Sequence, residues 1–333
     1  MALGTQANPI VLCALRNLAY KKKGELPIRN QVPTPSVYKD IAVTKTEEEL
    51  VPPVDTTASS STPWALENLP PFPAIATQLL QVVSREDVNL NEVGRFISSE
   101  PVFAADVLQI ANSPLYGLRS QVKSITHAIV VLGLERIKGI SLTRALAKHL
   151  KPALKVVALQ RCWQNSMAGA LLAERLARPC GIEPGLAYTA GLLRDIGRLA
   201  LLVKYPEPFA DMIAVSQANG FDLISTEREL FDVDHCQAGV WLTERMGLPE
   251  ELREVVAHHH DALPNHPFGL VELVHVADFM ADSLGFGVLV LAEPASFESA
   301  LELLPASARA RFDADPEELK SDLTSRLQVL CKS

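Results

Sequence analysis

The sequence lacks the features that mark several common classes of protein. No apolar run reaches the roughly 18 residues that a membrane-spanning helix needs, so we expect no membrane insertion. None of the five cysteines belongs to a C-x-x-C pair, and such scattered thiols predict a reduced, cytoplasmic protein. Alternating apolar and polar residues, which are typical of strands, are nearly missing. Catalytic signatures are missing too: there is no G-x-S-x-G elbow, Walker-type glycine loop or G-x-G-x-x-G motif.

Charge and composition exclude two further classes. The net charge of -8 argues against a protein that coats nucleic acid or an anionic membrane with its whole surface. Apolar residues make up 48% of the chain, which is enough to bury a hydrophobic core, so wholesale disorder is excluded. The length of 333 residues predicts two domains, or one domain with appendages.

Proline and hydroxyl residues dominate the region before residue 64. Residues 24–63 contain six prolines and ten Ser or Thr residues without a periodic apolar pattern, so we interpret this region as a linker. From Trp64 onward apolar residues recur at helical spacing, and Pro152 interrupts the pattern. We therefore predict an all-α protein. Its expected parts are a short helix and linker at 1–63, an N-terminal helical subdomain at 64–154, a second helical subdomain at 155–290 and a helical extension at 291–333.

Local signals predict where several helices begin and end. Ser124 is a typical N-cap residue, and Gly133 is typical of the position that follows the last turn of a helix. Together they predict one short helix between these two positions. Further helices are expected over residues 156–177, 186–204, 236–246, 249–260 and 269–284.

Histidines cluster in one part of the chain. Six of the eight fall within residues 235–275, and three are consecutive: His258, His259 and His260. Because imidazole is the commonest transition-metal ligand, this clustering suggests a metal site. The i, i+3, i+4, i+7 spacing from Leu252 places His259 on the buried face of its helix. On an exposed face, His258 and His260 would simply be solvated.

Two carboxylates are also expected in apolar surroundings. Asp195 lies in the apolar stretch G-L-L-R-D-I-G, where a carboxylate needs a partner. Asp278 lies four residues after Val274 and three before Ala281, so it is expected to point towards the core of the protein. A lone core histidine or aspartate is more often hydrogen-bonded to the backbone than bound to metal, and this interpretation stays open for each residue. Cys236 beside His235 is interpreted as structural, because adjacent helical residues face different directions.

An ordered series of short motifs runs from about residue 64 to about residue 284. The motifs are L-P-P-F-P at 69–73, E-P through A-N-S at 100–113, A-I-V-V-L-G at 128–133, A-G-L-L-R-D-I-G at 190–197, D-H at 234–235 with Gly239, L-P at 248–249 and H-H at 258–259. The series resembles the HDOD domains, which are relatives of the metal-dependent HD and HD-GYP phosphohydrolases. This resemblance implies a helical bundle of HD-like type with an N-terminal helical subdomain. It also implies a bacterial signalling module that binds partners or small ligands.

The chain departs from the hydrolases at two positions that the resemblance assigns to their metal site. Asn165 stands where a histidine precedes the His-Asp pair, and Arg194 replaces the histidine of the pair itself. A guanidinium is cationic at any accessible pH and opposes a divalent cation by Coulomb repulsion. Asp195 would instead form an ion pair with Arg194 or another base. We therefore expect no bound metal, no cofactor and no catalytic residue. The resemblance places the degenerate site at Asn165, Arg194, Asp195, His235, His258, His259 and Asp278.

Basic residues are concentrated in residues 134–161, which hold seven Lys or Arg and one acidic residue. The simplest interpretation is a solvated helical face. The functional alternative is an anion site for a phosphate-bearing second messenger or for the acidic surface of a partner. Its candidate residues are Arg136, Lys138, Arg144, Lys148 and Lys151.

Three classes of function remain open. The favoured class is a non-enzymatic regulatory module whose partners are other signalling proteins or a small ligand. The second is a residual metal-dependent phosphohydrolase that acts on nucleotides or cyclic dinucleotides. It would use Asp195, His235, His258, His259 and Asp278. The least favoured is a regulator that binds nucleic acid through the basic stretch.

Overall fold

A computed structural model describes residues 62–67, 69, 72, 74–83, 90–261, 267–290 and 296–330. Across these ranges every regular element is a helix, which confirms the predicted all-α class. The predicted N-terminal helix and linker lie outside the described residues, apart from the last two positions of the linker. Within the same ranges, no helix combines the length and the apolar character that crossing a membrane requires.

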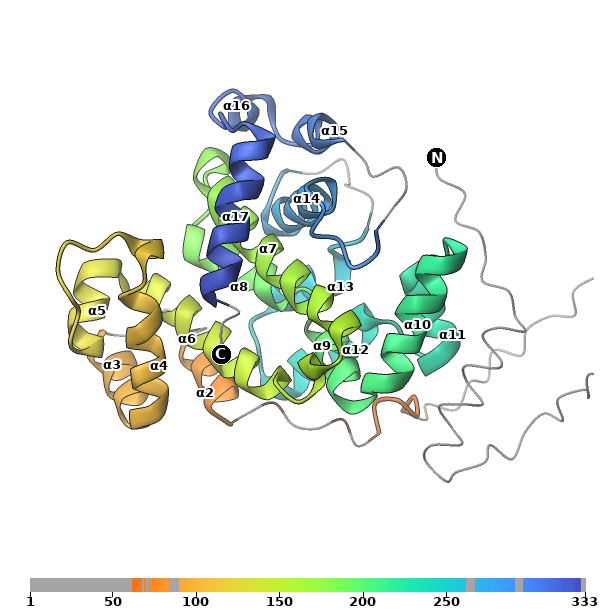
Figure 1. The fold of residues 1–333 in the computed structure, drawn as a ribbon, viewed down its shortest axis with the longest axis horizontal. Coiled ribbons are helices and arrows are strands. Elements are labelled where there is room, and N and C mark those ends of the chain that lie inside the picture. Colours follow the sequence, from red (N-terminus) through yellow and green to blue (C-terminus); the bar gives the residue numbers. More distant parts are fainter. Residues whose placement is uncertain are drawn as a thin grey trace, which may run out of the picture.

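Four short helices gather around the longer helix α6 at one end of the molecule (Figure 1). They are α2 (Ala74–Val83), α3 (Leu90–Ser98), α4 (Pro101–Ala111) and α5 (Ile125–Leu132), and α6 spans Leu134–Leu150. The predicted caps of α5 are confirmed, because the Ser124 hydroxyl accepts a hydrogen bond from the backbone N–H of His127 (3.1 Å) and Gly133 ends the helix. Gly133 has φ 89°, so the sharp joint between α5 and α6 depends on glycine.

Helix α7 forms the centre of the molecule (Figure 1). It spans Val157–Cys180, follows the short helix η3 (Ala153–Lys155), and packs against α8 (Pro184–Leu193) and α14 (Leu270–Ser283). The contact with α8 is close, since a Cβ atom at Gly191 would lie only 2.9 Å from the Cα atom of Ala170. The backbones of α7 and α8 therefore form a tightly packed support for the side chains that project from them.

The helix expected over residues 186–204 is two helices, and this prediction was wrong. Helix α8 ends at Leu193, and α9 (Ile196–Lys204) begins after Asp195. Both residues of the break, Arg194 and Asp195, are almost completely buried. At the break the two side chains form an ion pair with each other, since Arg194 Nη2 lies 3.2 Å from Asp195 Oδ2. Both therefore belong to one buried cluster.

Helices α10 to α13 follow α9 along the chain. They span Pro206–Asn219 (α10), Leu223–Phe231 (α11), His235–Met246 (α12) and Glu250–His258 (α13). Asp234 caps α12 in a capping box, in which its side chain accepts the N–H of Gln237 and the Gln237 side chain accepts the N–H of Asp234. Helix α13 ends two residues before its predicted end at position 260, and this difference changes where His260 points.

Three helices follow α14 at the C-terminal end: α15 (Phe297–Glu302), α16 (Ala306–Arg309) and α17 (Pro316–Leu330). Both α16 and α17 pack against α7. The buried residues of α17 are leucines that recur at helical spacing and form one apolar stripe. They are Leu319, Leu323, Leu327 and Leu330.

The contact between α9 and α12 has no room for a side chain at Gly197. A Cβ atom there would overlap the backbone carbonyl of His235 and the backbone nitrogen of Gly239. We expect Gly197→Ala to lower the free energy of unfolding by about 2 kcal/mol or more, because neither backbone group can move aside cheaply. Urea unfolding followed by circular dichroism measures this loss.

Gly94 in α3 provides the matched control. A Cβ atom at Gly94 would meet only side-chain atoms at ordinary contact distance, Ile129 Cδ1 at 3.6 Å and Thr126 Oγ1 at 3.7 Å. Gly94→Ala should therefore raise the free energy of unfolding by about 0.5–1 kcal/mol through its higher helix propensity. Equal effects of the two substitutions would contradict the close contact between α9 and α12.

Candidate functional site

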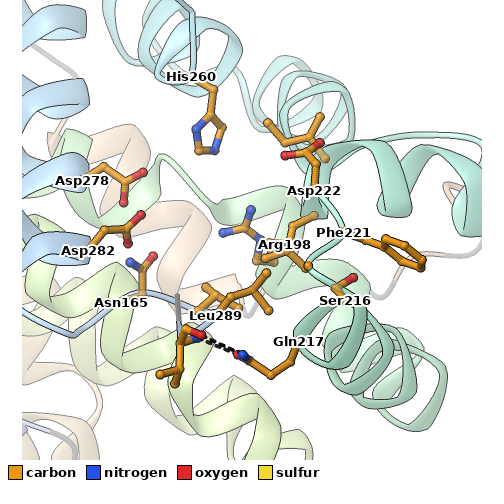
Figure 2. A pocket seen from close by; sticks show the side chains of 15 residues that line it. Asn165, Arg198, Ser216, Gln217, Phe221, Asp222, His260, Asp278, Asp282 and Leu289 are labelled. Carbon is orange, nitrogen blue, oxygen red and sulfur yellow. Dashed lines mark hydrogen bonds between the residues drawn. The ribbon is translucent and has the colours of Figure 1, made fainter. Parts of the chain in front are cut away.

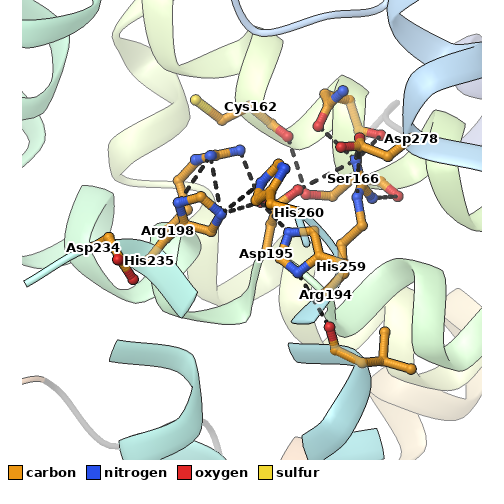
Figure 3. Close-up of polar contacts among 12 residues, drawn as sticks. Cys162, Ser166, Arg194, Asp195, Arg198, Asp234, His235, His259, His260 and Asp278 are labelled. Carbon is orange, nitrogen blue, oxygen red and sulfur yellow. Dashed lines mark hydrogen bonds and ion pairs between the residues drawn. The ribbon is translucent and has the colours of Figure 1, made fainter. Parts of the chain in front are cut away.

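A cluster of charged side chains, buried except for the partly exposed Asp278, lies where α7, α8, α9, α11, α12, α13 and α14 come together (Figure 3). Burial of so many ionisable groups requires that each one finds a partner of opposite charge or another hydrogen-bond partner. The cluster contains most of the residues that the sequence assigned to the degenerate site. They are Asn165, Arg194, Asp195, His235, His259 and Asp278.

Arg194 is fully buried and makes the largest set of hydrogen bonds in the cluster. Its Nε and Nη2 atoms donate to Asp278 Oδ1 at 3.1 and 2.6 Å. Its Nη1 atom donates to the carbonyls of Gly191 (2.8 Å) and Ser166 (3.3 Å), and Nη2 also donates to Asn165 Oδ1 at 2.6 Å. All five N–H groups of the guanidinium therefore have acceptors.

Helix α7 leaves space for this guanidinium at Gly169. A Cβ atom at Gly169 would overlap the Cζ and Nη atoms of Arg194, so any larger residue would displace the side chain. The sequence analysis did not identify Gly169, because a glycine inside a helix gives no sign of which side chain it faces.

Asp195 lies between two arginines and is only 1% exposed. Its Oδ2 atom is 3.2 Å from Arg194 Nη2, and its Oδ1 atom is 2.8 Å from Arg198 Nη1. Burial would raise the pKa of Asp195, but the guanidiniums of Arg198 and Arg194 outweigh it and hold the pKa well below its usual value. The expectation that Asp195 needs a base is confirmed. Sequence reasoning missed Arg198, although its i, i+3 spacing from Asp195 puts it on the same helix face.

Arg198 extends the network to Glu227 and His235. Its Nε atom donates to Glu227 Oε1 (3.1 Å), and its Nη2 atom lies 3.0 and 3.2 Å from the two ring nitrogens of His235. Glu227 Oε2 accepts from the backbone N–H of His235 (2.9 Å) and from its Nδ1 atom (2.5 Å). Glu227 was missed as well. The available signal was its spacing: Leu223, Glu227 and Leu230 follow i, i+4, i+7, which places Glu227 on the apolar face of α11.

The contact between Glu227 and His235 favours the charged form of both groups. Burial would raise the pKa of Glu227, but His235 and Arg198 lower it to about 2. Burial and Arg198 would each lower the pKa of His235, but the carboxylate of Glu227 raises it above its usual value. With His235 protonated, the network contains three cations (Arg194, Arg198 and His235) and three carboxylates (Asp195, Glu227 and Asp278).

The structure corrects the roles of two of the three consecutive histidines. His259 is buried, as predicted, with Nδ1 donating to the Val255 carbonyl (3.2 Å) and Nε2 3.7 Å from Asp195 Oδ1. His258, which was assigned to the degenerate site, has a half-exposed side chain that pairs with Asp261 instead. His260 was expected only to be solvated; it is exposed, but its Nε2 atom also lies 3.0 Å from Nε2 of His235. The reason is that α13 ends at His258, and the turn that follows redirects His260 towards the cluster.

One group of side chains offers metal-ligand atoms that all lie within 4.8 Å of one another. It consists of His235, Cys236, His259 and His260, so Cys236 does not face away from His235 as the sequence analysis assumed. However, the guanidinium of Arg198 lies against both ring nitrogens of His235. A divalent cation bound there would meet a fixed positive charge at contact distance. The donor set therefore does not fit a divalent metal unless Arg198 moves.

The five basic residues proposed as an anion site differ in their burial and in their ion pairs. Arg136 pairs with Glu174 of α7 (2.7 Å), whereas Arg144 pairs with Asp106 of α4 (3.5 Å). These partners lie on different helices, so the two arginines are engaged in separate ion pairs. Lys138 is buried against Glu135, and the remaining two residues, Lys148 and Lys151, are exposed.

A cavity of about 520 Å³ opens beside the charged cluster (Figure 2). It shares Asn165, Arg198, His260 and Asp278 with the cluster, so a molecule bound there would touch the network directly. The cavity is within the size range of binding sites for small molecules.

Because Asp195 lies between two buried guanidiniums, removal of its side chain should strongly affect the free energy of unfolding. Asp195→Ala would leave Arg194 and Arg198 short of counter-charge, and we expect it to lower the unfolding free energy by about 3 kcal/mol. The control is Asp211→Ala on the exposed surface of α10, which should change stability by no more than about 0.5 kcal/mol. An unchanged urea midpoint for Asp195→Ala would contradict the buried network.

The lowered pKa of Asp195 also predicts the acid limb of the stability curve. The pKa of Asp195 is lower in the folded protein than in the unfolded chain, where it is about 4. Such a carboxylate stabilises the folded protein at pH values above the unfolded pKa. This stabilisation is lost as the pH falls through the folded pKa. Below about pH 4, the slope of stability against pH should be smaller in Asp195→Ala than in the parent, by up to about 1.4 kcal/mol per pH unit. Asp211→Ala should keep the parental slope, and equal slopes in both variants would count against the prediction.

Comparisons with known proteins agree with the fold and with the motifs. The family model of the HDOD domain matches residues 69–262, which is more than half of the chain. The crystal structure of an HDOD domain protein with unknown function from Geobacter sulfurreducens superposes with a TM-score of 0.62 at 24% sequence identity. That similarity covers 79% of this chain and 91% of the Geobacter chain.

Curated relatives match shorter parts of their own sequences. An uncharacterized protein of Treponema pallidum is 22% identical over 223 residues, which cover 66% of this chain and 43% of that protein. Ribonuclease Y of Thermus thermophilus is 30% identical over 102 residues, which cover 31% of this chain and 13% of the enzyme. The chain thus spans less than half of the length of either relative. Since the family model matches more than half of its residues, the chain belongs to the HDOD domain family.

Proposed function

We propose that this protein is a non-catalytic module of bacterial signal transduction, which acts by binding another protein or a small ligand. The observation that carries the proposal is the guanidinium of Arg194, buried at the position where the resemblance places a metal ligand. It is joined to Asp278 and Asn165 by hydrogen bonds of 2.6 Å each. A permanent cation with no free N–H group takes up the ligands that an ion would use.

The two substituted positions compensate each other. Asn165 and Arg194 both stand where the hydrolases have histidine, and here the Asn165 amide oxygen accepts a hydrogen bond from Arg194. Together with Asp278 they join α7, α8 and α14 without an ion. An intact metallohydrolase would instead need neutral imidazoles and free carboxylates at these positions.

Asp195 and His235 are also committed to charged partners. Hydrolysis of a phosphodiester at neutral pH depends on an activated water and on offsetting the phosphate charge, which a bound metal supplies in this class of enzyme. Asp195 is held by two arginines, and protonated His235 donates to Glu227. In this proposal neither of these two groups acts as a general base.

A binding module needs a surface or a cavity whose occupation changes the population of its conformations. The cavity beside the cluster supplies one such place, because its lining residues come from several helices that a ligand would hold together. Partners of the protein are then other signalling proteins, which would read the change. In this proposal the charged network keeps the module folded and does not carry out chemistry.

A residual phosphohydrolase is the second candidate function. It is favoured by the ligand group of His235, Cys236, His259 and His260, and by the similarity of a segment to ribonuclease Y. It requires that Arg198 leaves the ring nitrogens of His235. The two candidates therefore differ in metal content, which is directly measurable.

The test compares metal content and hydrolysis in the parent and in a double variant. The purified parent, dialysed against manganese and then passed over a desalting column, should hold less than about 0.1 metal ion per chain, because Arg194 opposes binding. It should not hydrolyse bis-p-nitrophenyl phosphate. Asn165→His combined with Arg194→His should take up about one ion, since two imidazoles replace the guanidinium.

The matched control is Asn165→Ala combined with Arg194→Ala, which removes the charge without adding ligands and should not gain metal. Circular dichroism confirms that each variant is folded. Stoichiometric metal in the parent that survives chelation, together with phosphodiester turnover, would overturn the proposal in favour of the hydrolase.

A further inference from the structure

The cavity beside the charged cluster has an acidic side and an apolar side. Figure 2 shows Asp278 and Asp282 together on one side, and Phe221 on the other. Five aliphatic residues of the lining come from α11 and from the segment after α14: Leu223, Ile224, Val288, Leu289 and Val290. The remaining lining residues are Gly220 and six polar or charged residues, which are Asn165, Arg198, Ser216, Gln217, Asp222 and His260.

The charges around Asp282 leave it without a counter-ion. The groups that face it are Asp278 on its own helix, Arg194 and Asp195 between α8 and α9, and Arg198 on α9. Arg194 donates to Asp278, and Arg198 is engaged by Asp195 and Glu227. Within the described residues, no hydrogen bond or ion pair reaches the Asp282 carboxylate. Burial and then the charge of Asp278 raise the pKa of Asp282 to about 7.

The wall next to Asp282 is fixed in place. A Cβ atom at Gly287 would lie only 2.8 Å from Asp282 Oδ1, so this glycine leaves room for the carboxylate. Arg161 donates to the carbonyls of Gly287 (2.6 Å) and Val288 (3.2 Å). Gln217 spans the far end of the same segment, since its side chain donates to the Val290 carbonyl (2.7 Å) and accepts the Val290 N–H (2.6 Å). The cavity is therefore formed before any ligand arrives.

We propose that this cavity binds a small organic cation, with an ammonium group at Asp278 and Asp282 and an apolar body against Phe221 and Ile224. An ammonium offers three N–H donors, and hydrogen bonds between ions are stronger than neutral ones. A phosphate-bearing ligand fits poorly, because it would face the carboxylates of Asp278 and Asp282, while the Nε and Nη1 groups of Arg198 are already paired with Glu227 and Asp195. The inference rests on the proposed function, since a metal-loaded phosphodiesterase would need an anionic ligand here.

The experiment uses three probes of the same shape and different charge: tryptamine (ammonium), tryptophol (neutral) and indole-3-propionate (carboxylate). Calorimetric titration of the full chain at pH 8, above the pKa of Asp282, measures their affinities. We expect tryptamine to bind at least about tenfold more tightly than tryptophol, and indole-3-propionate to bind more weakly than both. Equal affinities, or tighter binding of the carboxylate, would overturn the proposal.

Two variants locate the ammonium. Asp282→Asn should weaken tryptamine at least about tenfold and leave tryptophol unchanged, because only the charged contact is lost. Asp222 also lines the cavity and caps α11 by accepting the N–H of Ser225, and asparagine caps equally well. Asp222→Asn should therefore stay folded and weaken tryptamine less than about threefold. Equal losses in both variants would overturn the assignment to Asp282.

The same samples separate this inference from the proposed function. Elemental analysis and a phosphodiester assay are run on the protein used for titration. Bound metal with turnover would defeat the proposed function and with it this inference. A metal-free, inactive protein without preference for tryptamine would defeat this inference alone.

Discussion

The buried guanidinium of Arg194 is the interaction on which the rest of the site depends. A charge taken out of water costs several kcal/mol unless it is fully paired and hydrogen-bonded. Its acceptors are Asn165 and Ser166 on α7, Gly191 on α8 and Asp278 on α14. Because these groups belong to three helices, satisfying one side chain fixes how the three helices pack. The planar guanidinium of an arginine can bind acceptors on three helices in a defined geometry, whereas the ammonium group of a lysine cannot.

Other features of the fold accommodate this buried network. Gly169 leaves space for the guanidinium, and the break between α8 and α9 allows Arg194 and Asp195 to enter the same cluster. Gly197 then lets α9 approach the start of α12, which brings His235 to within hydrogen-bond distance of Arg198. These are costs in helix propensity and continuity that an apolar core would not require. They are offset only if the complete network forms, so its members should behave as one unit in stability measurements.

The sequence predicted what depends on local pattern, and it failed where tertiary contacts decide. Helical spacing placed His259 in the core correctly, because its position follows from the apolar residues before it on the same helix. The same reasoning did not predict the contact of His260 with His235, since α13 ends at His258 without a residue that has a strong terminating preference. Arg198 and Glu227 were overlooked because charged residues are expected at the surface, and only their partners from other helices make burial favourable. The helix break at Arg194 could not be predicted either, because it also depends on contacts with other helices.

The balance of charge in the buried network underlies the proposed preference of the cavity for a cation. A divalent ion would offset two carboxylates, whereas a guanidinium offsets one. In this network Arg194, Arg198 and protonated His235 balance Asp195, Glu227 and Asp278, so no positive charge remains for a seventh group. Asp282 is that group, and it either holds a proton or attracts a cation from solution. In our proposal, the arginine that stands in place of a metal ligand thus leaves the adjacent cavity with an unbalanced carboxylate and a preference for cationic ligands.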